Sequence, residues 1–311
     1  MATRDFAAGP EPAIRLRAER RRVGEDVVKG VLALCALVSV ATTVGIVAAL
    51  LQPAIEFFRE ISLVDFFTGT DWAPLFKPAR FGVLPLLIGT LNVVVWACLV
   101  CMPFGLGAAI YLSEYARPRV RRILKPALEV LAGIPTVVFG FFALTFFTPF
   151  LRDLGLQVGV FNALSAGIVM GVMLIPVVAS ISEDAMAAVP TELRDGAYGL
   201  GASRLQVSTR IVVPAAISGI IASYVLAVSR AVGETMIVLI AAGGLAQLTV
   251  DPREPVQTMT AFIAATGIGD VPTGSTAYQT IFAVGLTLFS LTLAMNVFAI
   301  RLVRRYREIY E

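Results

Sequence analysis

The sequence predicts an all-α polytopic membrane protein with six transmembrane helices. Apolar residues make up 57% of the chain and charged residues only 15%, against about 45–50% and about 25% in ordinary soluble domains. Six apolar stretches of about 20 residues are each long enough to cross a hydrocarbon core of roughly 30 Å as a helix. They lack the alternation of apolar and polar residues that a transmembrane β-barrel needs.

The six stretches define the expected organisation of the chain. They lie at about 30–51, 83–111, 127–150, 164–182, 216–244 and 277–300. The first is too long for the h-region of a cleaved signal peptide, about 7–15 residues, so we expect it to remain as an anchor. Around the spans we expect a basic arm at 1–29, a basic connector at 113–126, a core membrane domain at 83–300 containing a loop at 185–214, and a tail at 301–311.

Basic residues predict the orientation of the spans. They are concentrated before the first span, after the second and fourth, and after the last, while the alternate loops hold few. By the positive-inside rule both termini should face the cytoplasm. The basic residues of the cytoplasmic side are Arg4, Arg15, Arg17, Arg20, Arg21, Arg22, Lys29, Arg117, Arg119, Arg121, Arg122, Lys125, Arg194, Arg204, Arg210, Arg301, Arg304, Arg305 and Arg307. This topology accounts for the basic arm without nucleic acid as a partner.

The residue inventory argues against an enzyme. The chain has no histidine, and none of its lysines ends a G-x-x-x-x-G-K-[ST] phosphate loop. Cys35, Cys98 and Cys101 all fall within predicted spans, where we interpret them as small packing residues. We therefore predict no catalytic residue, no metal site and no cofactor in this chain, and any ATP-driven work must come from a partner.

A polar segment between the fourth and fifth spans predicts a helix, a turn and a second helix. Glu192 and Asp195 come early, where acidic groups favour a helix start, and Gly199 and Gly201 then permit a bend. From these residues alone, the segment is either a hairpin that merely links two spans or a docking site on the water side.

The spacing of this segment resembles the EAA loop of binding-protein-dependent ABC importer permeases. Asp195 stands where that family has Glu, Gly196 where it has its first Ala, and Val213 where it has Leu before Pro. In that family the loop contacts a cytoplasmic ATPase subunit. The resemblance therefore implies that ATPase coupling is carried by Glu192, Asp195, Gly196, Ala197, Gly201, Leu205, Ile211 and Pro214.

Further segments are similar to the phosphate-specific permeases of this family, of the PstC type. They are AIYLSEYA at 109–116, GIPTVVFG at 133–140, SEDA at 182–185 and RAVGETM at 230–236. The resemblance implies a type I, MetI-like importer bundle in the bacterial cytoplasmic membrane, with inorganic phosphate as substrate. It also implies three kinds of partner: a second permease subunit of the PstA type, a PstB-type ATPase dimer that binds ATP-Mg, and an extracytoplasmic phosphate-binding protein of the PstS type.

Two charged residues inside the fifth predicted span are the candidate substrate contacts. Arg230 and Glu234 are four residues apart, so on a continuous helix they would share a face and could pair. The pair could be a structural salt bridge, or Arg230 could bind phosphate, because a guanidinium matches phosphate oxygens bidentately. Thr136 and Thr235 are neighbouring candidates on the substrate path.

Three other functions stay open from the sequence. The cargo could be another oxyanion, namely molybdate, sulfate or phosphonate. The chain could instead be a carrier or channel driven by a gradient, which would transport without an ATPase. It could also be a sensor or scaffold that reports phosphate status.

Overall fold

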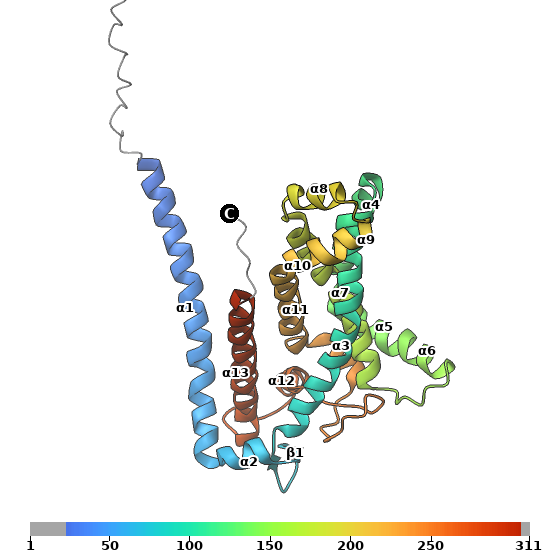
Figure 1. Cartoon of the computed structure of the whole chain (residues 1–311). Coiled ribbons are helices and arrows are strands. Elements are labelled where there is room, and N and C mark those ends of the chain that lie inside the picture. The colour runs from blue at the N-terminus through green and yellow to red at the C-terminus, as the bar shows by residue number, and fades with distance from the viewer. Residues whose placement is uncertain (1–22, 306–311) are drawn as a thin grey trace, which may run out of the picture. The chain divides into compact units, whose positions relative to one another are not determined.

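A computed structural model describes residues 23–305 of the chain (Figure 1). Residues 1–22 of the expected basic arm and residues 306–311 of the expected tail lie outside the described part. The chain divides into two units, Met1–Ala49 and Leu50–Glu311. The described part of the first unit is one uninterrupted helix, the beginning of α1 (Val23–Glu60), which contains the predicted 30–51 span.

The described part of the second unit is mainly helical. A two-stranded antiparallel hairpin pairs Trp72 with Phe81 and Ala73 with Arg80. The elements of the described part of the second unit are the end of α1, α2 (Leu63–Thr68), β1 (Trp72–Ala73), β2 (Arg80–Phe81), α3 (Leu84–Ile110), the π-helical η1 (Tyr111–Tyr115), α4 (Pro118–Gly133), α5 (Thr136–Phe142), η2 (Ala143–Phe147), α6 (Thr148–Asp153), α7 (Ala163–Ala187), α8 (Thr191–Gly199), α9 (Arg204–Val207), η3 (Ser208–Val212), α10 (Val213–Ala215), α11 (Ile217–Val232), η4 (Val238–Ala242), α12 (Met259–Ile268) and α13 (Thr276–Arg305).

The helices that could cross a membrane agree with the predicted class. Within residues 23–305, five helices are long and apolar enough, and a sixth span results if α9–α10 and α11, which are bent by 70° at Ala216, count as one. Figure 1 shows α4, α8 and α9 at one end of the second unit and α2 and β1 at the other. We call these the α8 end and the β1 end.

The third span differs from its predicted boundaries of 127–150. Residues 127–133 belong to α4, an amphipathic helix with no buried residue, and the membrane helix begins only at Thr136. The reason is Pro135, because the residue before a proline is disfavoured in the helical region. Ile134 is accordingly extended, with φ −68° and ψ 130°.

The fifth span is also interrupted, although the sequence predicts a continuous helix over 216–244. Helix α11 ends at Val232, Gly233 caps it, and helical structure resumes at Met236 and continues into η4. Glycine favours helix ends over helix interiors because of its conformational freedom. The break separates Arg230 from Glu234, and it decides the geometry of the site.

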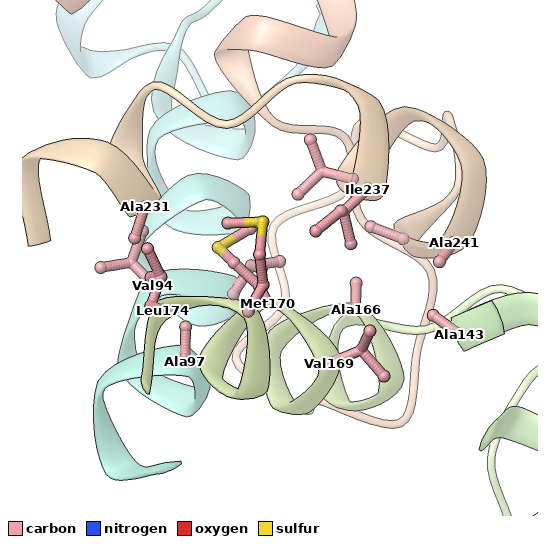
Figure 2. Close-up of a cluster of buried hydrophobic side chains, with 14 of the residues drawn as sticks. Val94, Ala97, Ala143, Ala166, Val169, Met170, Leu174, Ala231, Ile237 and Ala241 are labelled. Carbon is pink, nitrogen blue, oxygen red and sulfur yellow. The ribbon is translucent and has the colours of Figure 1, made fainter. Parts of the chain in front are cut away.

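Helices α3 and α7 form the core of the second unit, and glycines let them approach closely. A Cβ on Gly167 would lie 2.6 Å from the Cβ of Trp96, and one on Gly171 would lie 2.7 Å from the carbonyl oxygen of Ala97. Small residues at helix interfaces allow this kind of close packing in membranes. The side chains of Ala231 and Ile237, one before and one after the break, pack in the same buried cluster as Met170 of α7 (Figure 2).

Local caps position the helices that surround this core. The Asn162 side chain accepts a hydrogen bond from the Ser165 N–H at 2.7 Å and starts α7, and Thr258 does the same for α12 with Ala261. Side-chain oxygens at these positions satisfy backbone donors that have no partner within the helix.

Candidate functional site

The candidate site is built around the last turn of α11, which ends at the break. Arg230 lies in this last turn, as the last charged residue before Gly233. Its side chain is exposed, and within residues 23–305 it forms no hydrogen bond or ion pair. The carbonyl end of a helix favours a cation, so the position is compatible with a charged guanidinium. The structure therefore holds an arginine with no anion of its own in the described part of the chain.

Of the two alternatives for Arg230, the salt bridge with Glu234 is absent from the described residues. Glu234 lies beyond the end of α11, and its Oε1 accepts hydrogen bonds from the backbone N–H groups of Met236 at 3.0 Å and Ile237 at 3.4 Å. Side-chain oxygens commonly cap a helix start with these two contacts. The four-residue spacing fails because it presupposes an unbroken helix.

A second contact fixes the backbone at the same place. The Thr260 hydroxyl of α12 donates a hydrogen bond to the backbone carbonyl of Glu234 at 2.6 Å. Thr260 itself is buried. An interrupted span is tolerated where side chains satisfy the freed backbone groups, and Glu234 and Thr260 supply this satisfaction here.

Replacing Glu234 with alanine should lower the stability of the subunit. Loss of a side-chain cap costs about 1 kcal/mol, which corresponds to a fall of about 2–4 °C in melting temperature for a chain of this size. Thermal unfolding of the purified protein in detergent measures the change. Glu234→Gln is the control because its side-chain oxygen can still accept both hydrogen bonds, and an equal fall in both variants would contradict the capping role.

The two threonines of the predicted path lie at helix breaks. Thr136 is the first residue of α5, and the Thr235 hydroxyl donates to the carbonyl of Gly233 at 3.3 Å. Helix α5 packs against the segment that follows the second break: a Cβ on Gly140 would lie 3.0 Å from the Ile240 side chain. The structure therefore brings the segments after the two breaks together.

Arg230 lines a cavity of about 360 Å³ between α4, α7 and α11. The cavity walls are mainly apolar, and the polar groups in them come from few side chains. The charged residues of the lining are Arg230, Lys125, Glu129 and Glu183. An apolar cavity with a few convergent polar groups is the usual form of a small-ligand site.

A buried carboxylate with two cations lies on the same cavity. The Glu183 side chain is 1% exposed; Arg121 donates to its Oε1 and Lys125 to its Oε2, the latter at 2.7 Å. Lys125 also reaches Asp184 at 3.2 Å. The hydrogen bond to Glu183 raises the pKa of Lys125, although partial burial opposes this. We call Arg121, Lys125 and Glu183 the α4 clamp because they join α4 to α7.

At the α8 end, residues 191–207 form the helix–turn–helix that the sequence predicts. Helix α8 ends in a Schellman motif, in which the Gly201 N–H donates to the Tyr198 carbonyl and the Ala202 N–H to the Ala197 carbonyl. Gly201 has φ +83°, in the left-handed region, and a Cβ there would meet nothing within 4 Å. Ser203 and Gln206 then form a capping box that starts α9.

The predicted coupling residues divide between the surface and the interior of this hairpin. Ala197 is buried and Ile211 half-buried, while the others are exposed: Glu192, Asp195, Gly196, Gly201, Leu205 and Pro214. Leu200 is also 91% exposed and Leu205 63%, so the turn presents apolar side chains outward. Contiguous exposed apolar side chains are typical of a protein contact surface.

Arg194 attaches this hairpin to the ends of two core helices. Its guanidinium donates to the carbonyls of Met186 at 2.7 Å and Val189 at 2.6 Å, and to the Glu114 carboxylate at 3.3 Å. These carbonyls lie at the end of α7, and Glu114 lies in η1 after α3. A displacement of α8 would therefore act directly on α3 and α7.

Sequence reasoning missed the α4 clamp and Thr260. The i, i+4 spacing of Arg121 and Lys125 on an amphipathic segment was available as a signal, and Glu183 and Asp184 as the acidic counterpart. Nothing in the sequence linked the two segments. No local signal pointed to Thr260, because its partner lies 26 residues away.

The chain is similar to known proteins in family, in sequence and in fold. Residues 102–308 match the model of the family described as "Binding-protein-dependent transport system inner membrane component". The chain is 35% identical over 295 residues to the probable ABC transporter permease protein YqgH of Bacillus subtilis, covering 93% of this chain and 94% of that protein. It is 33% identical to the phosphate transport system permease protein PstC of Xylella fastidiosa, covering 76% of this chain and 77% of that protein.

Solved structures share the fold. A chain of a bacterial ABC transporter that imports the acidic polysaccharide alginate superimposes with a TM-score of 0.62 at 16% identity, covering 92% of this chain and 100% of that one. A chain of the MetNI methionine ABC transporter, in an inward-facing conformation, gives a TM-score of 0.54 at 18% identity, with 73% and 95% covered. The type I, MetI-like architecture expected from the sequence is thus present.

Proposed function

Because the chain belongs to the family of inner membrane components of binding-protein-dependent transport systems, we propose that it is the PstC-type permease subunit of an ATP-driven importer of inorganic phosphate. The observation that carries this proposal is Arg230, an arginine without an anionic partner in the described residues, on the wall of the cavity between α4, α7 and α11. An intramembrane arginine is costly and marks a substrate path by default. The names of the PstC relatives favour phosphate as the anion.

In this proposal Arg230 binds phosphate through its planar fork of N–H donors. Thr136 and Thr235, at the two helix breaks, do not line the cavity of Arg230, and we assign them to another part of the path. Glu234 uses Oε1 for capping, and its Oε2 has no hydrogen bond within residues 23–305. That oxygen can accept a hydrogen bond from a protonated phosphate oxygen and would favour phosphate over a fully deprotonated oxyanion such as sulfate.

The α8 end is proposed to face the cytoplasm, with both termini on that side of the bacterial cytoplasmic membrane. The exposed turn around Leu200 and Leu205 would then dock on a PstB-type ATPase dimer, which binds ATP-Mg. A PstA-type permease would complete the membrane path, and a PstS-type binding protein would deliver phosphate at the β1 end. Movement of α8 would reach α3 and α7 through Arg194 and alternate access to Arg230.

ATP-dependent uptake of radiolabelled phosphate by the complete complex in vesicles tests the function. We expect uptake that requires ATP and the binding protein, and that is competed by phosphate but not by equal concentrations of sulfate, molybdate or phosphonate. Uptake of one of those anions instead of phosphate would show that the importer transports that anion. Transport by this chain alone, driven by a gradient, would refute an ABC permease.

A further inference from the structure

A second cavity lies beside the one that contains Arg230. Its volume is about 440 Å³, and it is lined from η1 and α4 at the α8 end. The two cavities share Leu112, Lys125 and Glu129. Lys125 is therefore the cation common to both, placed between Arg230 and the surface of the α8 end.

The charged side chains that line this second cavity are mostly cations. Its charged lining residues are Arg121, Arg122, Lys125 and Glu129, three cations against one carboxylate. Two of these cations, Arg121 and Lys125, are bound to Glu183, whose carboxylate is buried. A dianion or monoanion that leaves Arg230 toward this end thus meets ammonium and guanidinium groups that already hold a carboxylate.

The two cations of the α4 clamp are not enclosed by the bundle. No residue of α4 is fully buried; the α4 clamp joins the helix to α7, and the partly buried Leu131 packs against the core that contains α7 residues. The cations remain in contact with water, with 42% of the Arg121 side chain and 33% of the Lys125 side chain exposed. The flexible stem of Lys125 lets its ammonium group turn from Glu183 to a passing anion, while Arg121 stays on Glu183 and keeps that buried carboxylate compensated.

We propose that Lys125 is a second anion-contacting residue, on the release side of Arg230, and that Glu183 competes with the transported anion for it. This inference rests on the proposed function. The anion passes from Arg230 to Lys125, which opens the α4 clamp. Glu183 then recovers Lys125, so the anion is not retained at the exit.

Competition and a purely structural clamp predict different results for two charge-neutralising variants. Glu183→Gln removes the buried carboxylate from Lys125 and Arg121 and leaves Lys125 with only the exposed Asp184, so the anion should bind more tightly. Lys125→Gln removes the contact itself, so the anion should bind more weakly. If the clamp is only structural, the two changes alter anion binding only through the net charge of this region, an effect that Arg119→Gln on the same helix also reports, so neither shift should exceed that of the control.

Both variants should fold. Glu183→Gln leaves two cations that are partly exposed to water, and Lys125→Gln leaves Glu183 paired with Arg121. Arg119→Gln is the matched control, because Arg119 is an exposed cation on the same helix and lines neither cavity.

The experiment is equilibrium binding of radiolabelled inorganic phosphate to the purified complex in detergent, without nucleotide and without the binding protein. We expect about tenfold tighter binding in Glu183→Gln, about tenfold weaker binding in Lys125→Gln, and a change below about twofold in Arg119→Gln. Any result in which the Glu183 and Lys125 variants do not shift in opposite directions, or shift no further than Arg119→Gln, overturns the proposal.

The failure of this inference can be told apart from failure of the proposed function. A wild-type complex that imports phosphate in vesicles, with variants that shift together, refutes only the role of Lys125. A complete wild-type complex that imports no phosphate refutes the phosphate assignment and this inference with it.

Discussion

Replacing Arg230 with glutamine is expected to abolish ATP-driven phosphate uptake while leaving the complex assembled. A hydrogen bond to a charged group contributes about 1.5–3 kcal/mol, so losing a bidentate contact should reduce uptake by at least about tenfold and as much as a hundredfold or more. Glutamine keeps a polar side chain of moderate length but carries no charge to compensate the anion inside the membrane.

The structure explains why this substitution should spare stability. Removing one partner of a buried ion pair is strongly destabilising because it leaves the other charge uncompensated. Within the described residues Arg230 has no ionic partner, so its removal leaves no carboxylate without a compensating cation. If Arg230 were paired with Glu234, as the spacing suggested, the variant would lose both stability and transport.

Uptake of radiolabelled phosphate in vesicles, with co-purification of the subunits as the check on assembly, measures the effect. Arg230→Lys is the matched control, because it keeps the charge but loses the planar fork. We expect its uptake to lie between those of wild type and Arg230→Gln. Wild-type uptake in an intact Arg230→Gln complex would show that the anion path lies elsewhere.

Replacing Gly201 with valine is expected to uncouple ATP hydrolysis from uptake. Gly201 has φ +83°, which costs an L-residue about 1–2 kcal/mol and a β-branched residue more. The backbone would leave this conformation and lose the Schellman hydrogen bonds from Gly201 and Ala202. The turn after Leu200 and the following helix α9 with Leu205, the apolar side chains proposed to contact the ATPase, would then move relative to α8.

The uncoupling in Gly201→Val would come from the backbone conformation and not from a steric clash of the side chain, because a Cβ at position 201 meets nothing within 4 Å. Gly201→Asn separates the two causes, since asparagine adds a side chain but tolerates the left-handed region. The measurement is the number of phosphate ions imported per ATP hydrolysed. We expect Gly201→Val to hydrolyse ATP with little uptake and Gly201→Asn to stay close to wild type. Equal coupling in wild type and Gly201→Val would contradict the role of this turn.

Much of the fold was predictable because its signals are local. The spans in α1, α3, α7 and α13 follow from the length and apolar character of continuous segments, which do not depend on packing. The turn after α8 followed from Gly201, since a left-handed residue needs glycine wherever the rest of the chain lies. The EAA-like spacing and Arg230 likewise pointed to an importer permease from the sequence alone.

The interrupted spans were predicted less well for a physical reason. Hydropathy averages over a window, so the apolar residues of amphipathic α4 merged with those of α5 into one predicted span across Pro135. The same averaging hid the break after Gly233, where a single glycine and the Glu234 cap end one helix and start the next.

By itself, then, the sequence determined the class of protein, its main spans, the turn at Gly201 and the presence of a charged residue within a span. The tertiary structure alone decided the partners of the charges. Glu183 meets Lys125 across 58 residues of chain, and Thr260 holds the carbonyl of Glu234 across 26. Such contacts depend on which helices pack together, whereas the i, i+4 rule that paired Arg230 with Glu234 holds only while one helix is continuous.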